Sequence, residues 1–265
     1  MAVEVTLVAR FKVGVQIRPQ HTTMDVLRRA WREADAMGVD TIFTWDHFYP
    51  LYGPEDGAHF EGWSMLAAMA CDTQQAHFGM MVTCNSYRNP DLLADMARTV
   101  DHLSHGRLIL GIGSGWFERD YDAYGYEFGT AIDRLHALGD ALPRIEARLQ
   151  VLNPPPVQSP LPILIGGAGE KVTLRIVAEH ANLWNTFGPP ENFAKKNAIL
   201  TEWCGKVGRD PAEIERTVMI RGANDVDRVE DYLEAGAQHI ILGVGTEGEE
   251  PIDLKPIRRL LDARS

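Results

Sequence analysis

Polar and aromatic residues gather directly after several short apolar runs of the chain, where their side chains could do chemistry. One such group is Thr44-Trp45-Asp46-His47-Phe48. An imidazole exchanges protons near neutral pH, so His47 is a candidate acid or base, and Asp46 is a candidate carboxylate beside it. Neighbouring residues of an extended chain point in different directions, so a direct pair between the two is not assumed. We expect at least one of them to face a reaction site.

Two glycine clusters follow apolar runs in the same way. Gly113-Ser114-Gly115 ends one run, and Gly166-Gly167-Ala168-Gly169 ends another just before a helical segment. Glycines in that position leave backbone N–H groups free to bind an anion at the positive end of a helix. One glycine turn is weak evidence, since tight turns favour glycine anyway. The two clusters together predict a phosphate-binding site.

Three tryptophans, Trp45, Trp116 and Trp184, also stand at the ends of predicted strands. Each alone is more typical of a residue that caps an apolar core. Because they coincide with the glycine turns, we interpret them as the wall of a site for a flat aromatic ligand.

The elements that position these residues are short β-branched runs that alternate with helical periodicity. The predicted strands are residues 11–17, 40–46, 77–83, 107–113, 163–166, 182–187, 217–221 and 239–244. The main predicted helices are residues 23–37, 63–73, 90–103, 131–152, 171–180 and 254–261, and a further long helical stretch runs through residues 211–214 before the seventh strand. Eight evenly spaced units favour a closed (β/α)8 TIM barrel of the α/β class over an open doubly wound sheet. The barrel accounts for residues 1–265 as a single domain, with the candidate residues at one mouth.

Composition limits the partners. The chain has 37 acidic and 26 basic residues, a net charge of −11, and no run of Lys or Arg, so nucleic acid is not expected. No apolar run approaches the ~18 residues of a membrane span, and Arg10 and Lys12 interrupt the first one, so we expect a cytoplasmic protein. The cysteines lack a C-x-x-C pair and are predicted to be buried thiols: Cys71, Cys84 and Cys204.

The sequence lacks the residues that other classes of barrel enzyme use for catalysis. The first strand has no His-x-His for a two-metal hydrolase, no strand ends in a lysine for a Schiff base, and Asp46 stands nearly alone as a strand-end carboxylate. We therefore expect no metal, and chemistry carried by an organic cofactor remains.

Three segments carry a family resemblance: TWDHF at 44–48, VTCNSYRNPDLLADMARTVDHLSHGRLILGIGSGW at 82–116, and ILIGGAGEKVTLRIVAEHANLWN at 163–185. With them the chain resembles the luciferase-like monooxygenase superfamily over almost its whole length, and most closely its coenzyme F420-dependent oxidoreductases. The resemblance implies a bacterial luciferase-like barrel whose cofactor ring lies at the mouth. It also implies a non-prolyl cis peptide in the third strand, near Met81 and Val82.

The same resemblance implies the site residues. Asp46 and His47 would lie beside the reactive edge of the ring as catalytic residues. The implied cofactor contacts are Thr83, Asn85, Arg88, Gly113, Ser114, Gly115, Gly166, Gly167 and Gly169, with the ring against the kink at Met81 and Val82. Trp116 and Trp184 are added to these contacts from their positions at strand ends. Relatives that oxidise sugar phosphates have a glutamate where this chain has Trp116, so their reaction is not carried over. Glu118, two residues later, stays open as an acid.

These observations lead to a hypothesis of hydride transfer between F420 and a small organic substrate. One alternative is an FMN-dependent luciferase-like monooxygenase, because the phosphate site suits either ring. Another is a flavin-binding protein without turnover. The resemblance also favours a homodimer.

Overall fold

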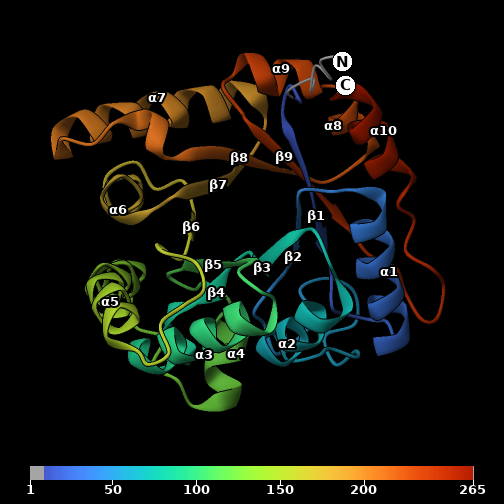
Figure 1. The fold of residues 1–265 in the computed structure, drawn as a ribbon, viewed down its shortest axis with the longest axis horizontal. Helices are drawn as coiled ribbons and strands as arrows, with labels where there is room; N and C mark the ends of the chain where they lie inside the picture. Colours follow the sequence, from blue (N-terminus) through green and yellow to red (C-terminus); the bar gives the residue numbers. More distant parts are fainter. Residues whose placement is uncertain (1–8, 265) are drawn as a thin grey trace, which may run out of the picture.

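The structure is a computed structural model that describes residues 9–264, in which strands alternate with helices. The strands are β1 (Lys12–Ile17), β2 (Thr41–Thr44), β3 (His77–Met80), β4 (Thr83–Cys84), β5 (Leu108–Gly113), β6 (Ile163–Gly166), β7 (Leu183–Phe187), β8 (Glu215–Ile220) and β9 (His239–Val244). They pair in the order β3-β2-β1-β9-β8-β7-β6-β5-β4, and β3 also pairs with β5. The parallel sheet therefore closes into the predicted (β/α)8 barrel (Figure 1).

The predicted strands are confirmed, with differences in their bounds. The third, residues 77–83, is divided into β3 and β4 at a cis peptide bond between Met81 and Val82, which is the bond that the resemblance implied. The second ends at Thr44, two residues early, and β8 begins at Glu215, two residues before the predicted start. The first eight residues, on which the expectation of a cytoplasmic protein partly rests, lie outside the described range.

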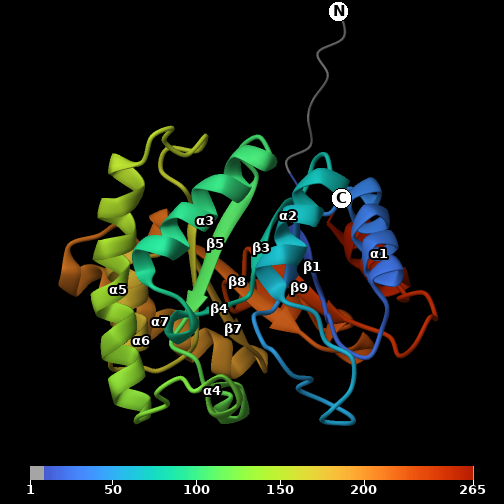
Figure 2. The same ribbon diagram turned by 90° about the horizontal axis from the view of Figure 1, so that it is seen from below.

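Helices surround the barrel and form its outer layer (Figures 1 and 2). They are α1 (Met24–Met37), α2 (Gly62–Asp72), α3 (Pro90–Leu103), α4 (Glu118–Tyr124), α5 (Ala131–Val151), α6 (Thr173–His180), α7 (Pro190–Val207), α8 (Ala223–Val226), α9 (Val229–Glu234) and α10 (Lys255–Ala263). The sequence did not predict α4, α8 and α9, because each is too short to show a helical period. Within residues 9–264, no helix is both long and apolar enough to cross a membrane.

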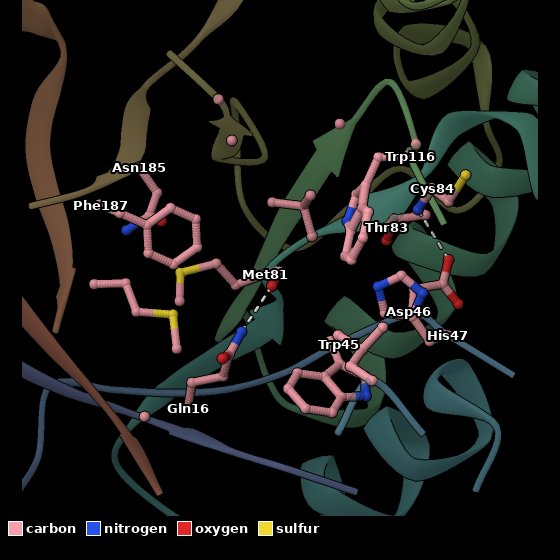
Figure 3. A pocket seen from close by; sticks show the side chains of 18 of the residues that line it. Gln16, Trp45, Asp46, His47, Met81, Thr83, Cys84, Trp116, Asn185 and Phe187 are labelled. Atoms are coloured by element: carbon pink, nitrogen blue, oxygen red, sulfur yellow. Dashed lines mark hydrogen bonds between the residues drawn. The ribbon is translucent and has the colours of Figure 1, made fainter. Parts of the chain in front are cut away.

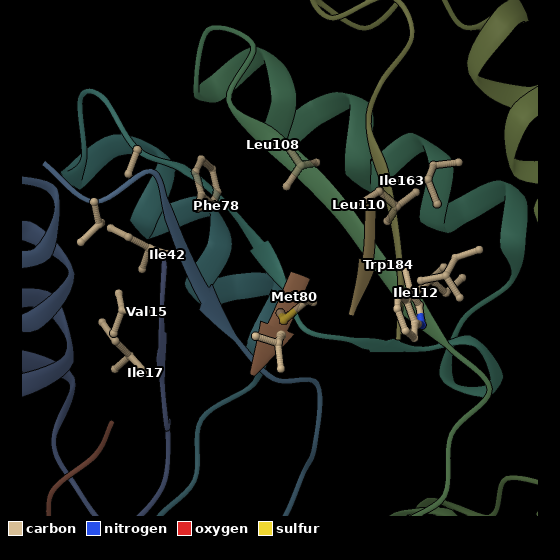
Figure 4. Close-up of a cluster of buried hydrophobic side chains, with 14 of the residues drawn as sticks. Val15, Ile17, Ile42, Phe78, Met80, Leu108, Leu110, Ile112, Ile163 and Trp184 are labelled. Carbon is tan, nitrogen blue, oxygen red and sulfur yellow. The ribbon is translucent and has the colours of Figure 1, made fainter. Parts of the chain in front are cut away.

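Strand side chains alternate between two apolar layers. Those that point outward, such as Val15, Ile42 and Leu110, pack under the helices (Figure 4). A smaller cluster fills the inside of the barrel: Phe43, Met81, Ile109, Leu164, Leu183, Met219 and Ile241. Burying these side chains favours the closed barrel.

A polar network joins four strand positions at the amino end of the barrel. The fully buried His239 contacts Thr41 Oγ1 through Nε2 at 2.9 Å and Glu215 Oε1 through Nδ1 at 2.8 Å. Lys12 Nζ donates to the other Glu215 oxygen at 2.6 Å. Gly14 makes room for this network, since a Cβ there would lie 2.8 Å from His239 Nε2. The network therefore ties β1 and β2 to β8 and β9 on the side away from the candidate residues.

The three cysteines do not share one environment. Cys84 and Cys204 are buried as predicted, but the prediction is wrong for Cys71, which is exposed on α2. The apolar face of that helix is formed by Leu66, Met69 and Ala70 instead.

Candidate active site

A cavity of about 500 Å³ opens at the carboxyl ends of the strands, where barrel enzymes carry their reactive groups. Figure 3 shows the side chains around it. They come from both halves of the chain and are mostly apolar or glycine, with a few polar groups. Such a composition is typical of a cofactor or substrate site.

His47 is held by a buried carboxylate from another loop. Its Nδ1 lies 2.7 Å from Oδ2 of Asp120, whose side chain is completely buried, whereas 11% of the His47 side chain is exposed. Asp120 belongs to α4, which follows the fourth strand position of the barrel. Phe48 N–H donates to the other oxygen of Asp120 at 3.1 Å. The loop after β2 and the helix after β5 thus meet at this carboxylate.

The hydrogen bonds around Asp120 indicate which ring nitrogen of His47 carries the proton. Tyr87 OH donates to Asp120 Oδ2 at 2.8 Å. Burial raises the pKa of Tyr87 far above its usual range, so this phenol stays a donor. Asp120 therefore acts as an acceptor, and Nδ1 of His47 donates to it. The Nε2 atom of His47 is left to accept a proton or, once protonated, to donate one.

Asp46, the other predicted catalytic residue, is bound by a guanidinium. Its carboxylate accepts from Arg88 at 2.6 and 3.0 Å and from the backbone N–H of Cys84 at 3.1 Å. Burial raises the pKa of Asp46, although Arg88 acts in the opposite direction. Burial lowers the pKa of Arg88, but the Asp46 carboxylate outweighs it and the net shift is upward. Asp46 and Arg88 therefore brace β2 against β4.

Four glycines from the ends of β5 and β6 line the cavity, and we call Gly113, Gly115, Gly166 and Gly167 the glycine wall. A Cβ at Gly113 would lie 2.7 Å from Val82 Cγ2, and one at Gly166 would lie 2.9 Å from Val82 Cγ1. Only residues without side chains leave Val82 its place and keep a flat opening beside it.

Two polar side chains, those of Gln16 and Thr83, also line this part of the cavity. Gln16 Nε2 donates to the Met81 carbonyl at 2.8 Å and holds this part of the cavity in place. Thr83 lines the same cavity, and its buried Oγ1 has no hydrogen-bond partner among the described residues. A buried hydroxyl without a partner is costly, so a ligand at this site would satisfy it. The glycine wall and Thr83 together fit a flat group with polar edges.

Two of the three predicted tryptophans line the cavity. Trp116 is 63% exposed at its rim, with its ring 5.8 Å from that of His47, and Trp45 lies deeper. Trp45 Nε1 donates to His59 Nε2 at 2.9 Å, and burial, followed by the charge of His47, lowers the pKa of His59 to about 4. His59 is thus neutral near pH 7 and serves Trp45 as an acceptor.

Trp184 is a correction. It is fully buried and stacks on Phe193 of α7, with ring centroids 5.4 Å apart, on the outer side of β7. Residues of a strand alternate between the two faces, and its neighbour Asn185 takes the position that lines the cavity. Trp184 Nε1 donates to the Gly167 carbonyl at 2.7 Å, so it supports the glycine wall from behind.

Of the predicted site residues, some line the cavity and others lie behind its lining. Those that line the cavity as expected are Asp46, His47, Met81, Val82, Thr83, Gly113, Ser114, Gly115, Trp116, Gly166 and Gly167. Those that lie outside its lining are Asn85, Arg88, Gly169 and Trp184. Asn85 enters a turn of 3₁₀ helix (Asn85–Tyr87), Arg88 is occupied by Asp46 and Glu61, and Gly169 packs under Thr173. The Gly167 N–H is also not free, since it donates to the Asn185 carbonyl at 3.0 Å.

Sequence reasoning missed Asp120. It pointed to Glu118 as the possible acid, but Glu118 is exposed on α4 and lies outside the cavity lining. A signal was present, since Asp120 follows the fourth predicted strand by a few residues. Its contact with His47 spans 73 positions of the chain, which no local pattern reveals.

Comparison with known proteins identifies relatives of the whole barrel. A family model described as luciferase-like monooxygenase matches residues 3–256. A phthiodiolone/phenolphthiodiolone dimycocerosates ketoreductase of Mycobacterium tuberculosis (strain ATCC 25618 / H37Rv) is 27% identical over 245 residues. That match covers 78% of this chain and 64% of the relative.

Two solved structures are similar in fold. An F420-dependent secondary alcohol dehydrogenase, solved with an F420-acetone adduct, matches with a TM-score of 0.80 and 15% identity, over 97% of this chain and 98% of the other. The oxygenating constituent of 3,6-diketocamphane monooxygenase of Pseudomonas putida, solved with FMN, matches with a TM-score of 0.65 and 14% identity, over 84% and 71%. At identities this low, the two matches show a similar fold and nothing more.

Proposed function

The chain belongs to the luciferase-like monooxygenase family, and we propose that it is an F420-dependent oxidoreductase that acts on a small organic substrate. The observation that carries this proposal is the His47–Asp120 pair, which presents a proton-exchanging nitrogen beside a cavity with a glycine wall. The ketoreductase relative and the F420-dependent structural neighbour support this type of reaction.

The described residues fit the cofactor in three ways. The glycine wall and Val82 leave a flat opening for a ring, and Thr83 offers a hydroxyl that lacks a partner. Ser114 and Gly115 would lie near its phosphate and sugar groups. When bound, the deazaflavin supplies or accepts a hydride at the reactive carbon of the substrate.

The residues of the chain provide the proton transfer that accompanies hydride transfer. Reduction of a carbonyl needs a hydride at carbon and a proton at oxygen, and oxidation of an alcohol is the reverse. Nε2 of His47 would give the proton in one direction and take it in the other. Asp120 fixes the ring through Nδ1, and the rings of Trp45 and Trp116 lie edge-to-face with it.

Cofactor titration is the first test. Trp45 and Trp116 line the cavity, so their fluorescence should be quenched when a ring enters it. We expect binding of F420 at micromolar or tighter affinity, and much weaker binding of FMN. Preference for FMN, with oxygen consumption by the reduced form, would favour the monooxygenase alternative. Binding of neither would refute the proposal.

A second test concerns turnover. We expect a His47→Ala variant to bind F420 as the unchanged protein does, and to lose about 10²-fold in the F420-dependent reduction of small ketones. His136→Ala, which changes an exposed histidine of α5, is the matched control and should leave both unchanged. If His47→Ala binds F420 normally and turns over at the original rate, His47 has no role in proton transfer. A protein that binds F420 but shows no turnover would be a flavin-binding protein.

A further inference from the structure

Two arginines line the cavity on the side formed by the end and the beginning of the chain. Arg18 directly follows β1, and Arg221 directly follows β8. We call these two residues the arginine rim. Strand β9 lies between β1 and β8 in the barrel, so the two guanidinium groups extend from positions two strands apart.

Neither guanidinium has an acidic partner among residues 9–264. No carboxylate oxygen of those residues lies within 4.0 Å of either one, whereas Arg88 and Arg119 are both paired. Arg18 Nε is buried and has no hydrogen-bond partner in the described chain. Arg221 lies over the ring of Phe187, 4.5 Å from its centre, which orients the guanidinium without neutralising it.

Glycines at the end of the strand between them let the Arg18 side chain reach the cavity. Gly243 lines the cavity and has no side chain, and a Cβ at Gly245 would lie 2.7 Å from Arg18 Nε. The remaining charged group of the lining, Asp46, is neutralised by Arg88. In a chain with a net charge of −11, this side of the cavity is therefore positive.

The arginine rim lies opposite the glycine wall. The glycines come from the ends of β5 and β6, which the barrel order separates from β1 and β8 by β2 and β3 on one side and by β7 on the other. A ring against the glycine wall would therefore leave the arginine rim to another molecule, with Met219 and Asn185 between them.

From this arrangement we propose that the arginine rim binds an anionic oxygen group, a carboxylate or phosphate, of the substrate. Guanidinium groups bind both groups through paired, charge-assisted hydrogen bonds. The proposal rests on the proposed function for the identity of the cofactor, but the predicted anion site does not depend on which ring is bound. The substrate is thus a small molecule with a reducible or oxidisable carbon at one end and an anionic group at the other.

The test uses three probes of similar size: benzoate, phenyl phosphate and neutral benzyl alcohol. Calorimetric titration of each, with and without saturating F420 or FMN, measures affinity for the cavity. We expect at least one anion to bind about tenfold or more tightly than benzyl alcohol, and this preference to weaken at high salt. If the alcohol binds as well as both anions, or if no anion binds at about 10 mM, the proposal is wrong.

Variants separate the substrate from the cofactor. Arg18→Gln and Arg221→Gln should each weaken anion binding about tenfold or more while the affinity for F420 stays within about twofold. Arg144→Gln, which removes an exposed arginine of α5, is the matched control and should change neither. Loss of F420 affinity with unchanged anion binding would assign the arginines to the cofactor and overturn the proposal. Failure of F420 to bind at all, with anion binding intact, would refute the proposed function alone.

Discussion

At the scale of single residues, the buried carboxylate of Asp120 decides how His47 works. A substitution of Asp120→Asn keeps the shape but replaces an acceptor by an amide that can also donate. We expect kcat for ketone reduction to fall about 10²-fold, because the ring is no longer held in one tautomer. KM and the affinity for F420 should stay nearly unchanged.

A control for this substitution lies on the same helix. Asp122 is an exposed residue of α4, so Asp122→Asn should leave kcat, KM and F420 affinity unaltered. If Asp120→Asn raised KM instead and left kcat intact, Asp120 would act in binding rather than in orienting His47.

Gly113 allows a second prediction at this scale. A methyl group at this position would lie 2.7 Å from Val82 Cγ2 and would push that side chain toward the cavity. Overpacking costs about 1–3 kcal/mol, so Gly113→Ala should weaken F420 binding about tenfold or more in the fluorescence titration.

Gly205 offers the matched comparison. It lies inside α7, and a Cβ there would meet no atom within 4 Å. Gly205→Ala should therefore keep the affinity for F420 and raise the free energy of unfolding by about 0.5–1 kcal/mol. Unchanged binding in Gly113→Ala would mean that Val82 can turn away from the ring.

The place of a residue in the cavity was predictable where the residue lies at or near the end of a predicted strand. His47 and Ser114 directly follow predicted strands, Val82 lies near the end of another, and all three line the cavity as expected. Trp184 was misplaced by one position of a strand, which moves a side chain to the opposite face. Asp120 and the arginine rim were missed, because their importance comes from what faces them and not from what adjoins them in sequence.

At the scale of elements, the amino end of the barrel is fastened by ionisable groups. Burial raises the pKa of Glu215, but His239 and Lys12 outweigh it and hold the pKa at about 2. A depressed carboxylate pKa stabilises the fold above the pKa of the unfolded chain, about 4.3, and this contribution is lost as the pH falls toward 2.

We therefore expect Glu215→Gln to lower the free energy of unfolding by about 3 kcal/mol at pH 7. Denaturant titrations at several pH values would measure this, and the difference from the original protein should shrink between pH 4 and 2. Glu213→Gln, an exposed neighbour paired with Arg209, should have little effect at any pH. A difference that does not change with pH would show that packing, and not charge, is the cause.

Elements with a clear period were the ones that the sequence predicted. The strands show continuous apolar runs, and α1 begins at a Thr23 cap and ends before Gly38. The break between β3 and β4 came from the family resemblance, since nothing in the residues around Met81 marks it. Helix α4 has two turns and a charged sequence, so no apolar stripe reveals it.

At the scale of the whole molecule, a bound cofactor should stabilise the barrel. A ligand at 100 times its Kd adds about 2.7 kcal/mol to the free energy of unfolding. For a chain of this length we expect F420 to raise the Tm by about 5–10 °C in a thermal unfolding experiment, and FMN to change it little. An equal or larger shift with FMN would contradict the assignment of the cofactor.

The number of subunits is a further prediction at this scale. The family resemblance favours a homodimer, and light scattering of the purified protein would measure the mass in solution. A mass that corresponds to one chain would contradict this expectation.

The residues that line the cavity also come from two separate stretches of chain. His47, Val82 and Asp120 precede the largely exposed proline-rich connector at residues 153–160, whereas Gly166 and Arg221 follow it. If the protein were made as two fragments split in that connector, neither fragment would contain a complete site. Catalysis would then require the halves to associate, so its return on mixing them would serve as a complementation reporter.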